Sequence, residues 1–261
     1  MRTLMLSLLA AALAAAPASA GDWRGDGKLV LTDGIGTVEG AAGGGIATWA
    51  VIAGNETERG VGATAHASHV LLPDFDLEAY GGAIGLFDRV ELSYTRQSFD
   101  TRTAGAALGL GRGFTFRQDV FGAKIRLFGD AVWDQDRLVP QVAVGAQHKR
   151  ANRGAVIAAV GGADHAGTDY YVSATKLFLA RSLLVSATMR LTEANQLGLL
   201  GHGGDKGRDH GAQFEGSAAM LVTRRLAVGG EFRTKPDRLS FAEEDDAYDL
   251  FAAWSMHRHV T

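Results

Sequence analysis

The stretch with the most side chains capable of chemistry is GHGGDKGRDHG, residues 201–211. It contains His202, Asp205, Asp209 and His210, whose side chains are of the kinds that bind transition metals. A metal site needs a regular element that holds its ligands at a fixed spacing, whereas the glycines of this stretch are typical of a solvated surface loop. We therefore predict no metal and no cofactor here.

Hydrolysis is the other chemistry to consider. Asp164 and His165 adjoin one another among scattered serines, but neighbours in sequence are not an arranged catalytic dyad, and the sequence lacks a G-x-S-x-G motif. Lys206, in GGDKGR, is not followed by the Ser or Thr of a phosphate-binding loop. The sequence therefore predicts no catalytic residue.

The segments that must position any site alternate apolar and polar residues over most of the chain. In LLVSATMRLT, residues 183–192, Val185 and Met189 share one face while Thr188 and Arg190 share the other. Alternation with period two predicts β-strands. We predict eleven of them, near residues 45–53, 61–71, 75–86, 89–98, 116–128, 137–147, 168–178, 182–192, 211–222, 226–234 and 247–256.

The connections between these strands alternate in length from residue 89 onward. We predict long loops at 98–117, 148–167, 193–210 and 234–246, and tight turns at 180–181 and 224–225. Short turns at one rim and long loops at the other are typical of an up-and-down outer-membrane barrel, and a Greek-key sandwich is not expected to alternate so regularly.

The N-terminus begins with Arg2, an apolar run over residues 4–16 and the small triplet at 18–20. This pattern predicts a signal peptide over residues 1–20, cleaved after Ala20. An N-terminal segment, 21–44, and a barrel domain, 45–261, are expected to follow. The chain has no cysteine, so after export it must be stabilised by packing and backbone pairing without disulfides.

These patterns predict an all-β fold, an antiparallel up-and-down transmembrane β-barrel of about 12 strands in the outer membrane. The apolar strand faces would meet lipid and the polar faces would line the interior. A soluble periplasmic β-barrel or sandwich is the alternative, in which the same strands would be turned inside out.

Under the barrel reading, eight charged side chains line the lumen: Glu91, Lys124, Arg126, Arg190, Glu215, Glu231, Arg233 and Asp249. Opposite charges fall on neighbouring strands, with Glu91 beside Lys124 and Arg126, Arg190 beside Glu215, and Arg233 beside Asp249. Such cross-strand pairs each stabilise a sheet by roughly 0.2–1 kcal/mol. Structural pairs that fill a narrow interior are therefore favoured over an ion-selectivity ladder.

Three segments, RVELSYTRQSFD, TDYYVSATKLFLA and ANQLGLLGHGGD, resemble a proteobacterial family, the domain of unknown function 3034 family. The resemblance extends through most of the mature chain. It implies an exported, outer-membrane β-barrel protein and brings no activity that could be assigned to residues here.

Eleven strands is an odd number, whereas bacterial single-chain barrels have an even one. The chain ends in MHRHVT, where a turn would lead into a further strand. Either the chain is C-terminally truncated, or GKLVLTDG near Lys28 supplies the closing strand. The resemblance favours truncation, because family members continue past this point.

We expect a pore or a binding protein for a small solute, and not an enzyme. The weaker alternatives are the soluble periplasmic binding protein and a barrel-borne hydrolase. Expected partners are outer-membrane lipid and lipopolysaccharide, the barrel-assembly machinery and a small-molecule solute. Nucleic acid is not expected, because the formal net charge is −3 and no basic patch is interleaved with aromatic residues.

Overall fold

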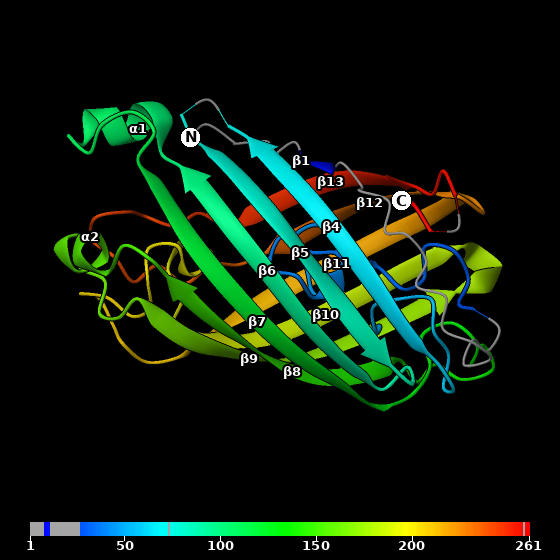
Figure 1. Cartoon of the computed structure of the whole chain (residues 1–261). Helices are drawn as coiled ribbons and strands as arrows, with labels where there is room; N and C mark the ends of the chain where they lie inside the picture. Colours follow the sequence, from blue (N-terminus) through cyan, green and yellow to red (C-terminus); the bar gives the residue numbers. More distant parts are fainter. Residues whose placement is uncertain (1–7, 11–26, 73, 258) are drawn as a thin grey trace.

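The structure, a computed structural model, describes residues 8–10, 27–72, 74–257 and 259–261. Its main feature is an antiparallel sheet of ten long strands joined in sequence order, strongly curled around its own concave face (Figure 1). These strands are β4 (Val61–Leu71), β5 (Asp76–Leu86), β6 (Val90–Asp100), β7 (Thr115–Phe128), β8 (Gln141–Ala151), β9 (Ala166–Phe178), β10 (Leu183–Thr192), β11 (Gly211–Thr223), β12 (Leu226–Arg233) and β13 (Ala247–Trp254). Ten of the eleven predicted strands are thereby confirmed.

The curled sheet is open, a half-barrel. A three-residue strand, β1 (Leu8–Ala10), pairs antiparallel with β4, so the sheet ends at β1 on one side and at β13 on the other. The rest of the predicted signal peptide lies outside the described residues. In the described part of the chain, the helices are all too short or too polar to cross a membrane.

The connections alternate in length, as predicted. Long ones join β6 to β7, β8 to β9, β10 to β11 and β12 to β13; they carry α1 (Arg102–Ala107), α2 (Gly154–Ala159) and the 3₁₀ turn η2 (Gln196–Gly198). At the other end lie the turns before β6, β10 and β12, one of which forms η1 (Leu179–Arg181), and a longer connection at 129–140. The two ends are called the long-loop end and the short-turn end below.

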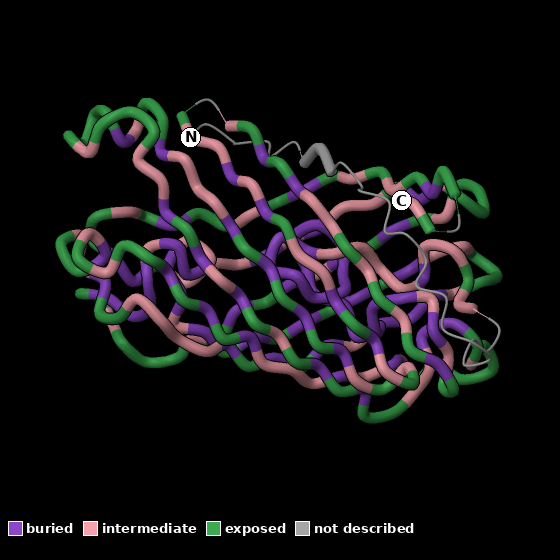
Figure 2. Tube along the Cα trace, viewed as in Figure 1, coloured by how far each residue is buried: buried purple, intermediate pink, exposed green. Residues whose placement is uncertain are grey.

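Polar and apolar side chains alternate along each strand, and this alternation decides which side chains point into the curl. In β10, the polar Ser186, Thr188 and Arg190 are buried, whereas Val185 and Met189 are exposed on the convex face. The same alternation of buried and exposed residues continues along the other strands (Figure 2). The sheet is therefore polar on its concave face and apolar on its convex face.

The concave face is filled by the chain itself. Residues 37–54, called the inner segment, are all buried and run inside the curl. Apart from the short strands β2 (Ile35–Gly36) and β3 (Ala42–Gly43), this region is irregular. The strand predicted at 45–53 is thus wrong; residues there form a single backbone bridge, from Thr48 to Gly43.

Composition explains why the inner segment fits. Its sequence, VEGAAGGGIATWAVIAG after Thr37, consists mainly of Gly and Ala, which leave room for a backbone inside a narrow curl. Gly44 shows the constraint directly, because a Cβ there would collide with the carboxylate of Glu231. Larger side chains would not allow this approach.

Two apolar clusters lie at opposite ends of the interior. At the short-turn end, Trp49 and Val51 of the inner segment pack with Leu177 and Leu184 of the wall. At the long-loop end, the cluster consists of Val70, Leu77, Phe116, Ala151, Ile157 and Leu199. The buried charges lie between these two clusters.

Candidate functional site

The eight charged residues predicted to face the interior are all buried, with at most 7% of any of them exposed. They surround the inner segment. A buried charge is tolerated only when it is paired or hydrogen-bonded. The hydrogen-bond and ion-pair partners of each residue therefore indicate its role in the interior.

Glu91 and Lys124 form a predicted pair that the structure contains, with 3.0 Å between Lys124 Nζ and Glu91 Oε2. Both also bind the inner segment. The backbone N–H groups of Ala42 and Ala53 donate to the Glu91 carboxylate at 3.1 and 2.8 Å. Lys124 Nζ donates to the carbonyl of Val51 at 2.7 Å. The pair therefore satisfies backbone groups of the inner segment as well as each other.

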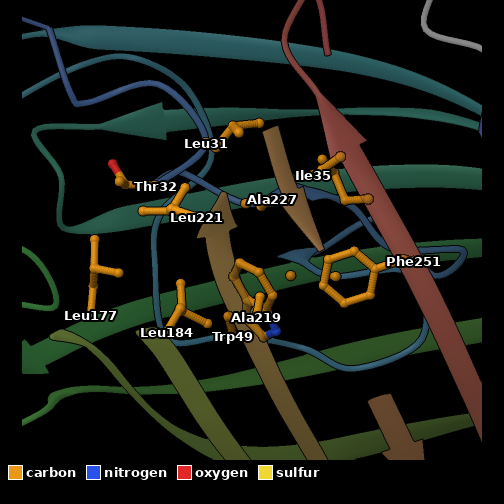
Figure 3. A pocket seen from close by; sticks show the side chains of 14 residues that line it. Leu31, Thr32, Ile35, Trp49, Leu177, Leu184, Ala219, Leu221, Ala227 and Phe251 are labelled. Atoms are coloured by element: carbon orange, nitrogen blue, oxygen red, sulfur yellow. The ribbon is translucent and has the colours of Figure 1, made fainter. Parts of the chain in front are cut away.

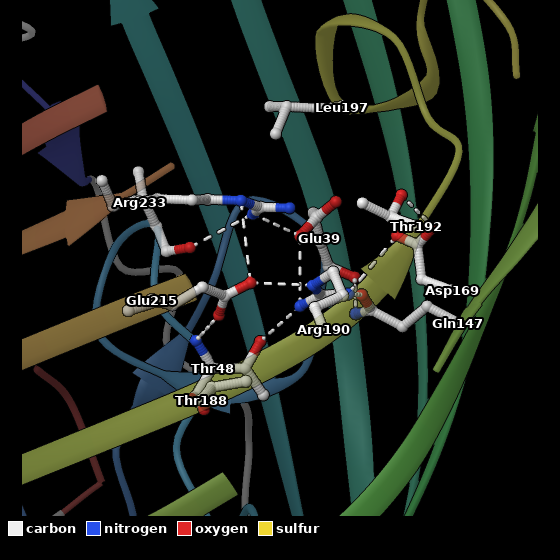
Figure 4. A network of polar contacts seen from close by, with 12 residues as sticks. Glu39, Thr48, Gln147, Asp169, Thr188, Arg190, Thr192, Leu197, Glu215 and Arg233 are labelled. Carbon is white, nitrogen blue, oxygen red and sulfur yellow. Dashed lines mark hydrogen bonds and ion pairs between the residues drawn. The ribbon is translucent and has the colours of Figure 1, made fainter. Parts of the chain in front are cut away.

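A larger network lies in the middle of the interior (Figure 4). Glu39 of the inner segment accepts hydrogen bonds from Lys149 and from Arg233 Nη1, the latter at 2.6 Å, and lies 3.7 Å from Arg190 Nη2. Burial by itself would raise the pKa of Glu39, but these three cations hold that pKa well below its usual value. Glu39 is therefore a buried carboxylate that stays ionised.

Two wall carboxylates complete this network. Asp169 lies 2.7 Å from Lys149 Nζ and 3.4 Å from Arg190 Nη1. Glu215 accepts from Arg190 Nε at 2.7 Å, which is another predicted pair. Three carboxylates and three cations thus alternate around the centre of the interior, so that each charge faces opposite charges.

Sequence reasoning missed three members of this network. Lys149 and Asp169 lie at inward positions near strand ends, beyond or at the limits of the predicted strands, where the alternation could have identified them. Glu39 had no such signal, because it stands outside any strand in a Gly- and Ala-rich stretch.

Arg233 and Arg126 do not have the partners that sequence neighbourhood suggested. Arg233, predicted beside Asp249, pairs with Glu39 instead, since the sheet register sets Asp249 opposite Glu231. Among the described residues, neither carboxylate oxygen of Asp249 has a hydrogen-bond partner.

Arg126 also turns away from Glu91. It pairs with Asp88 and with Asp130, the latter at 3.3 Å, and its Nε donates to the carbonyl of Gly129 at 2.9 Å. These partners all belong to connections at the short-turn end. Arg126 therefore fastens that rim and does not take part in the central network.

Glu231 binds successive backbone N–H groups of the inner segment. The N–H groups of Gly45 and Ile46 both donate to Glu231 Oε2 at 2.7 Å, and Ser217 Oγ donates to its other oxygen at 2.6 Å. Nearby, the N–H of Thr48 donates to Glu215 at 2.8 Å. Carboxylates of the wall thus act as acceptors for backbone N–H groups that the inner segment does not pair internally.

Neutral side chains of the wall do the same for the carbonyl groups. Gln97 donates to the carbonyl of Val38 and Gln141 to that of Ala50, each at 2.8 Å. Buried backbone groups must be paired, and the inner segment pairs only some of them internally, such as the N–H of Val38 with the carbonyl of Gly45 and the N–H of Trp49 with the carbonyl of Ala42. The concave face is therefore polar because its side chains form hydrogen bonds with the backbone of the inner segment.

The inner segment is anchored at the short-turn end by Lys28. Its Nζ lies 2.9 Å from Asp88 and 3.5 Å from Glu56, and it donates to the carbonyl of Ile52 at 2.6 Å. Burial raises the pKa of Glu56 to about 7, although Lys28 works against that shift. Glu56 is thus a titratable group near neutral pH at the exit of the inner segment.

An apolar hollow lies between the inner segment and the short-turn ends of β9 to β13 (Figure 3). Trp49 and Ile35 of the N-terminal region and Leu184 and Phe251 of the wall are among its lining residues. The enclosed part of this hollow is small, about 30 Å³. Its lining suits a small apolar group.

The residues considered first for chemistry do not converge on one point. His202 is buried, and burial lowers its pKa to about 4. His210 is exposed and contacts the carbonyl of Thr168, while Asp205 accepts a hydrogen bond from the N–H of Ser240. In the part of the chain that the structure describes, no three His, Asp or Glu side chains form a group that could hold a metal ion.

Comparison with protein families gives one match, which covers residues 32–261: a family described as "Protein of unknown function (DUF3034)". Comparisons with curated proteins and with solved structures give no match. The family match covers the inner segment and all ten long strands.

Proposed function

This chain belongs to the DUF3034 family of proteins of unknown function, and we propose that it is an outer-membrane β-barrel that binds or passes a small solute. In this proposal the signal peptide directs export, the curled sheet closes into a transmembrane barrel, and the role is not enzymatic. Outer-membrane lipid, lipopolysaccharide and the barrel-assembly machinery are its partners.

The observation that carries the proposal is the polarity of the two faces. Exposed apolar side chains recur along the convex face, among them Ile84, Leu92, Phe121, Ile125, Val172, Met189, Phe214, Val228 and Leu250. Soluble monomers rarely expose apolar surface so continuously, whereas a transmembrane barrel requires it. A soluble sandwich would need the opposite facing, with its apolar side chains on the buried face.

The strand count also supports closure. Ten is an even number, so β4 and β13 run antiparallel and could pair directly once β1, which lies within the predicted signal peptide, no longer occupies the edge of β4. This replaces our expectation of about twelve strands by ten in the described part of the chain. Direct pairing would remove the exposed edge that an open sheet presents.

Fractionation of cells that express the protein tests this location. We expect the protein in the outer-membrane fraction, with a lower apparent mass in unheated than in boiled detergent samples, because a closed barrel resists unfolding by detergent. Recovery as a soluble periplasmic protein without a heat-dependent shift would refute the membrane barrel.

The inner segment lies in the path that a solute would take through the barrel. It fills the interior between two apolar clusters, which supports a gated path over a permanently open pore. In this proposal the segment must shift before a solute crosses. A disulfide between the segment and the wall would then block transport.

Ala50 and Thr175 are suitable positions for this disulfide. The N–H of Ala50 donates to Thr175 Oγ1 at 2.8 Å, and both residues are fully buried. Because the chain has no cysteine, the pair A50C/T175C can form only the intended bond. We expect channel openings of the reduced variant in planar bilayers to disappear on oxidation and return on reduction, with both single variants insensitive. Equal conductance in the oxidised and reduced states would contradict gating by this segment.

A further inference from the structure

The convex face is not apolar over its whole height. On β6, β7 and β8, outward positions in the half of each strand toward the long-loop end carry three exposed arginines, Arg96, Arg117 and Arg150. We call these three residues the arginine patch. We propose that the arginine patch binds the phosphate groups of lipopolysaccharide in the outer leaflet.

The sheet register places the three arginines side by side. Arg96 lies opposite Asp119, and Asp119 lies opposite Arg150 on the next strand. Arg117 stands two residues before Asp119 on β7, diagonal to both other arginines. Diagonal neighbours across adjacent strands are about 7–8 Å apart, within reach of long side chains. The three guanidinium groups can therefore approach a single ligand.

Two of these arginines have no side-chain hydrogen bond that would compete with a ligand. Arg96 is bound to Asp119, with its Nε 2.8 Å from Asp119 Oδ1, although the Arg96 side chain remains 56% exposed. Arg150 lies opposite Asp119 and interacts with it electrostatically, but among the described residues the side chains of Arg117 and Arg150 make no hydrogen bond. Two further acidic residues lie on this face: Asp100 accepts a hydrogen bond from the N–H of Arg102 at 2.9 Å, and Glu78 is bound to the hydroxyl of Tyr80 at 2.5 Å. Arg117 and Arg150 thus leave unbalanced positive charge on this surface.

The position of the patch indicates what it binds. Directly below it in the register come Tyr94 and Phe121, whose ring centroids are 5.1 Å apart, and then Leu92 and Ile125. The patch therefore borders the apolar band, where lipid headgroups would lie. This inference rests on the proposed function, which sets the long-loop end on the outside, where the outer leaflet consists of lipopolysaccharide.

The chemistry of the ligand follows from the donors. Guanidinium groups bind phosphate through paired, charge-assisted hydrogen bonds, and clusters of basic residues beside an apolar membrane surface attract anionic headgroups. At the same end of β9 to β13, outward positions hold Tyr170, Leu191, Phe214 and Tyr248 instead. The patch is thus a local site on β6 to β8 and not a general property of the rim.

The test compares two double variants of the purified protein in non-ionic detergent. R117Q/R150Q removes the two arginines whose side chains make no hydrogen bond and leaves the pair of Arg96 with Asp119 intact. R224Q/R225Q makes the same charge change at exposed positions in the turn between β11 and β12, at the short-turn end. Native mass spectrometry with added bis-phosphorylated lipid A measures binding, and the heat-dependent gel shift reports that each barrel is folded.

We expect the wild type and R224Q/R225Q to bind lipid A with the same affinity, and R117Q/R150Q to bind at least about tenfold more weakly. Lipid A with one phosphate should bind the wild type more weakly, and phosphatidylglycerol should not compete. Equal binding by both double variants, with their gel shifts intact, would overturn the lipid site alone. Equal competition by phosphatidylglycerol would overturn the assignment to lipopolysaccharide. Loss of the wild-type gel shift would instead refute the barrel on which this site depends.

Discussion

At the scale of single residues, Glu39 joins the inner segment to three strands at once. Its carboxylate is bound by Lys149 of β8 and Arg233 of β12 and faces Arg190 of β10. Removing one partner from a buried ion network leaves the other charges uncompensated, which costs more than the pair itself contributes.

We therefore predict that Glu39→Gln, which keeps the shape of the side chain, lowers the free energy of unfolding by about 3–5 kcal/mol. Urea titration of the folded protein in detergent measures this change. Asp119→Asn is the matched control: it breaks the exposed pair with Arg96, and should cost at most about 1 kcal/mol. Similar losses in the two variants would mean that the central network does not hold the interior together.

Glu56 makes stability depend on pH. Burial raises its pKa from the ordinary value of 4.5 to about 7, so between these pH values the folded protein binds this proton more strongly than the unfolded chain. The free energy of unfolding should therefore fall as the pH rises through this window, by at most about 1.4 kcal/mol per pH unit.

The expected result is that Glu56→Gln removes this part of the pH dependence. Urea titrations of the wild type and the variant at pH 5, 6, 7 and 8 isolate the contribution of Glu56. The contributions of other titratable groups cancel when the free energies of unfolding of the two proteins are subtracted. A difference between the two proteins that stays constant with pH would show that Glu56 titrates normally.

At the scale of elements, the ten long strands could be predicted because their alternation is a local property of the sequence. The inner segment could not, since many of its backbone hydrogen bonds go to side chains far away in the chain, such as Glu91 and Glu231. A stretch of glycine and alanine also has no alternation of polar and large apolar side chains from which its structure could be predicted. The sequence therefore predicted eight of the charges that point inward, but it missed Lys149 and Asp169 near the strand ends and did not predict that Glu39 would be the partner of Arg233.

The outward face of β10 gives a direct test of a single element. Ala187 is exposed near the middle of this strand, where an arginine facing lipid would cost about 2–4 kcal/mol. We predict that Ala187→Arg lowers the amount of heat-modifiable protein in the outer membrane. Ala107→Arg, an exposed position in α1, is the control and should assemble normally. Normal assembly of Ala187→Arg would argue that β10 does not face lipid.

At the scale of the whole molecule, the arrangement has three layers across its width: an apolar convex face, a wall of strands with polar inward side chains, and a buried segment that those side chains bind. Along its axis, apolar clusters lie on either side of the ion network. A filled interior explains why the inward charges of opposite sign are paired and give no ring of one sign for selecting ions.

The measurement that tests this account most directly is a scan of single cysteines along β10 in the cysteine-free chain. Each variant is spin-labelled, reconstituted into liposomes and exposed to oxygen, which collects in lipid, and to a water-soluble nickel chelate. We predict that labels at Val185, Ala187 and Met189 collide mainly with oxygen, and that labels at Ser186 and Thr188 collide with neither reagent. Outward labels that meet the nickel chelate would contradict the membrane barrel, and inward labels that meet it would contradict an interior filled by the inner segment.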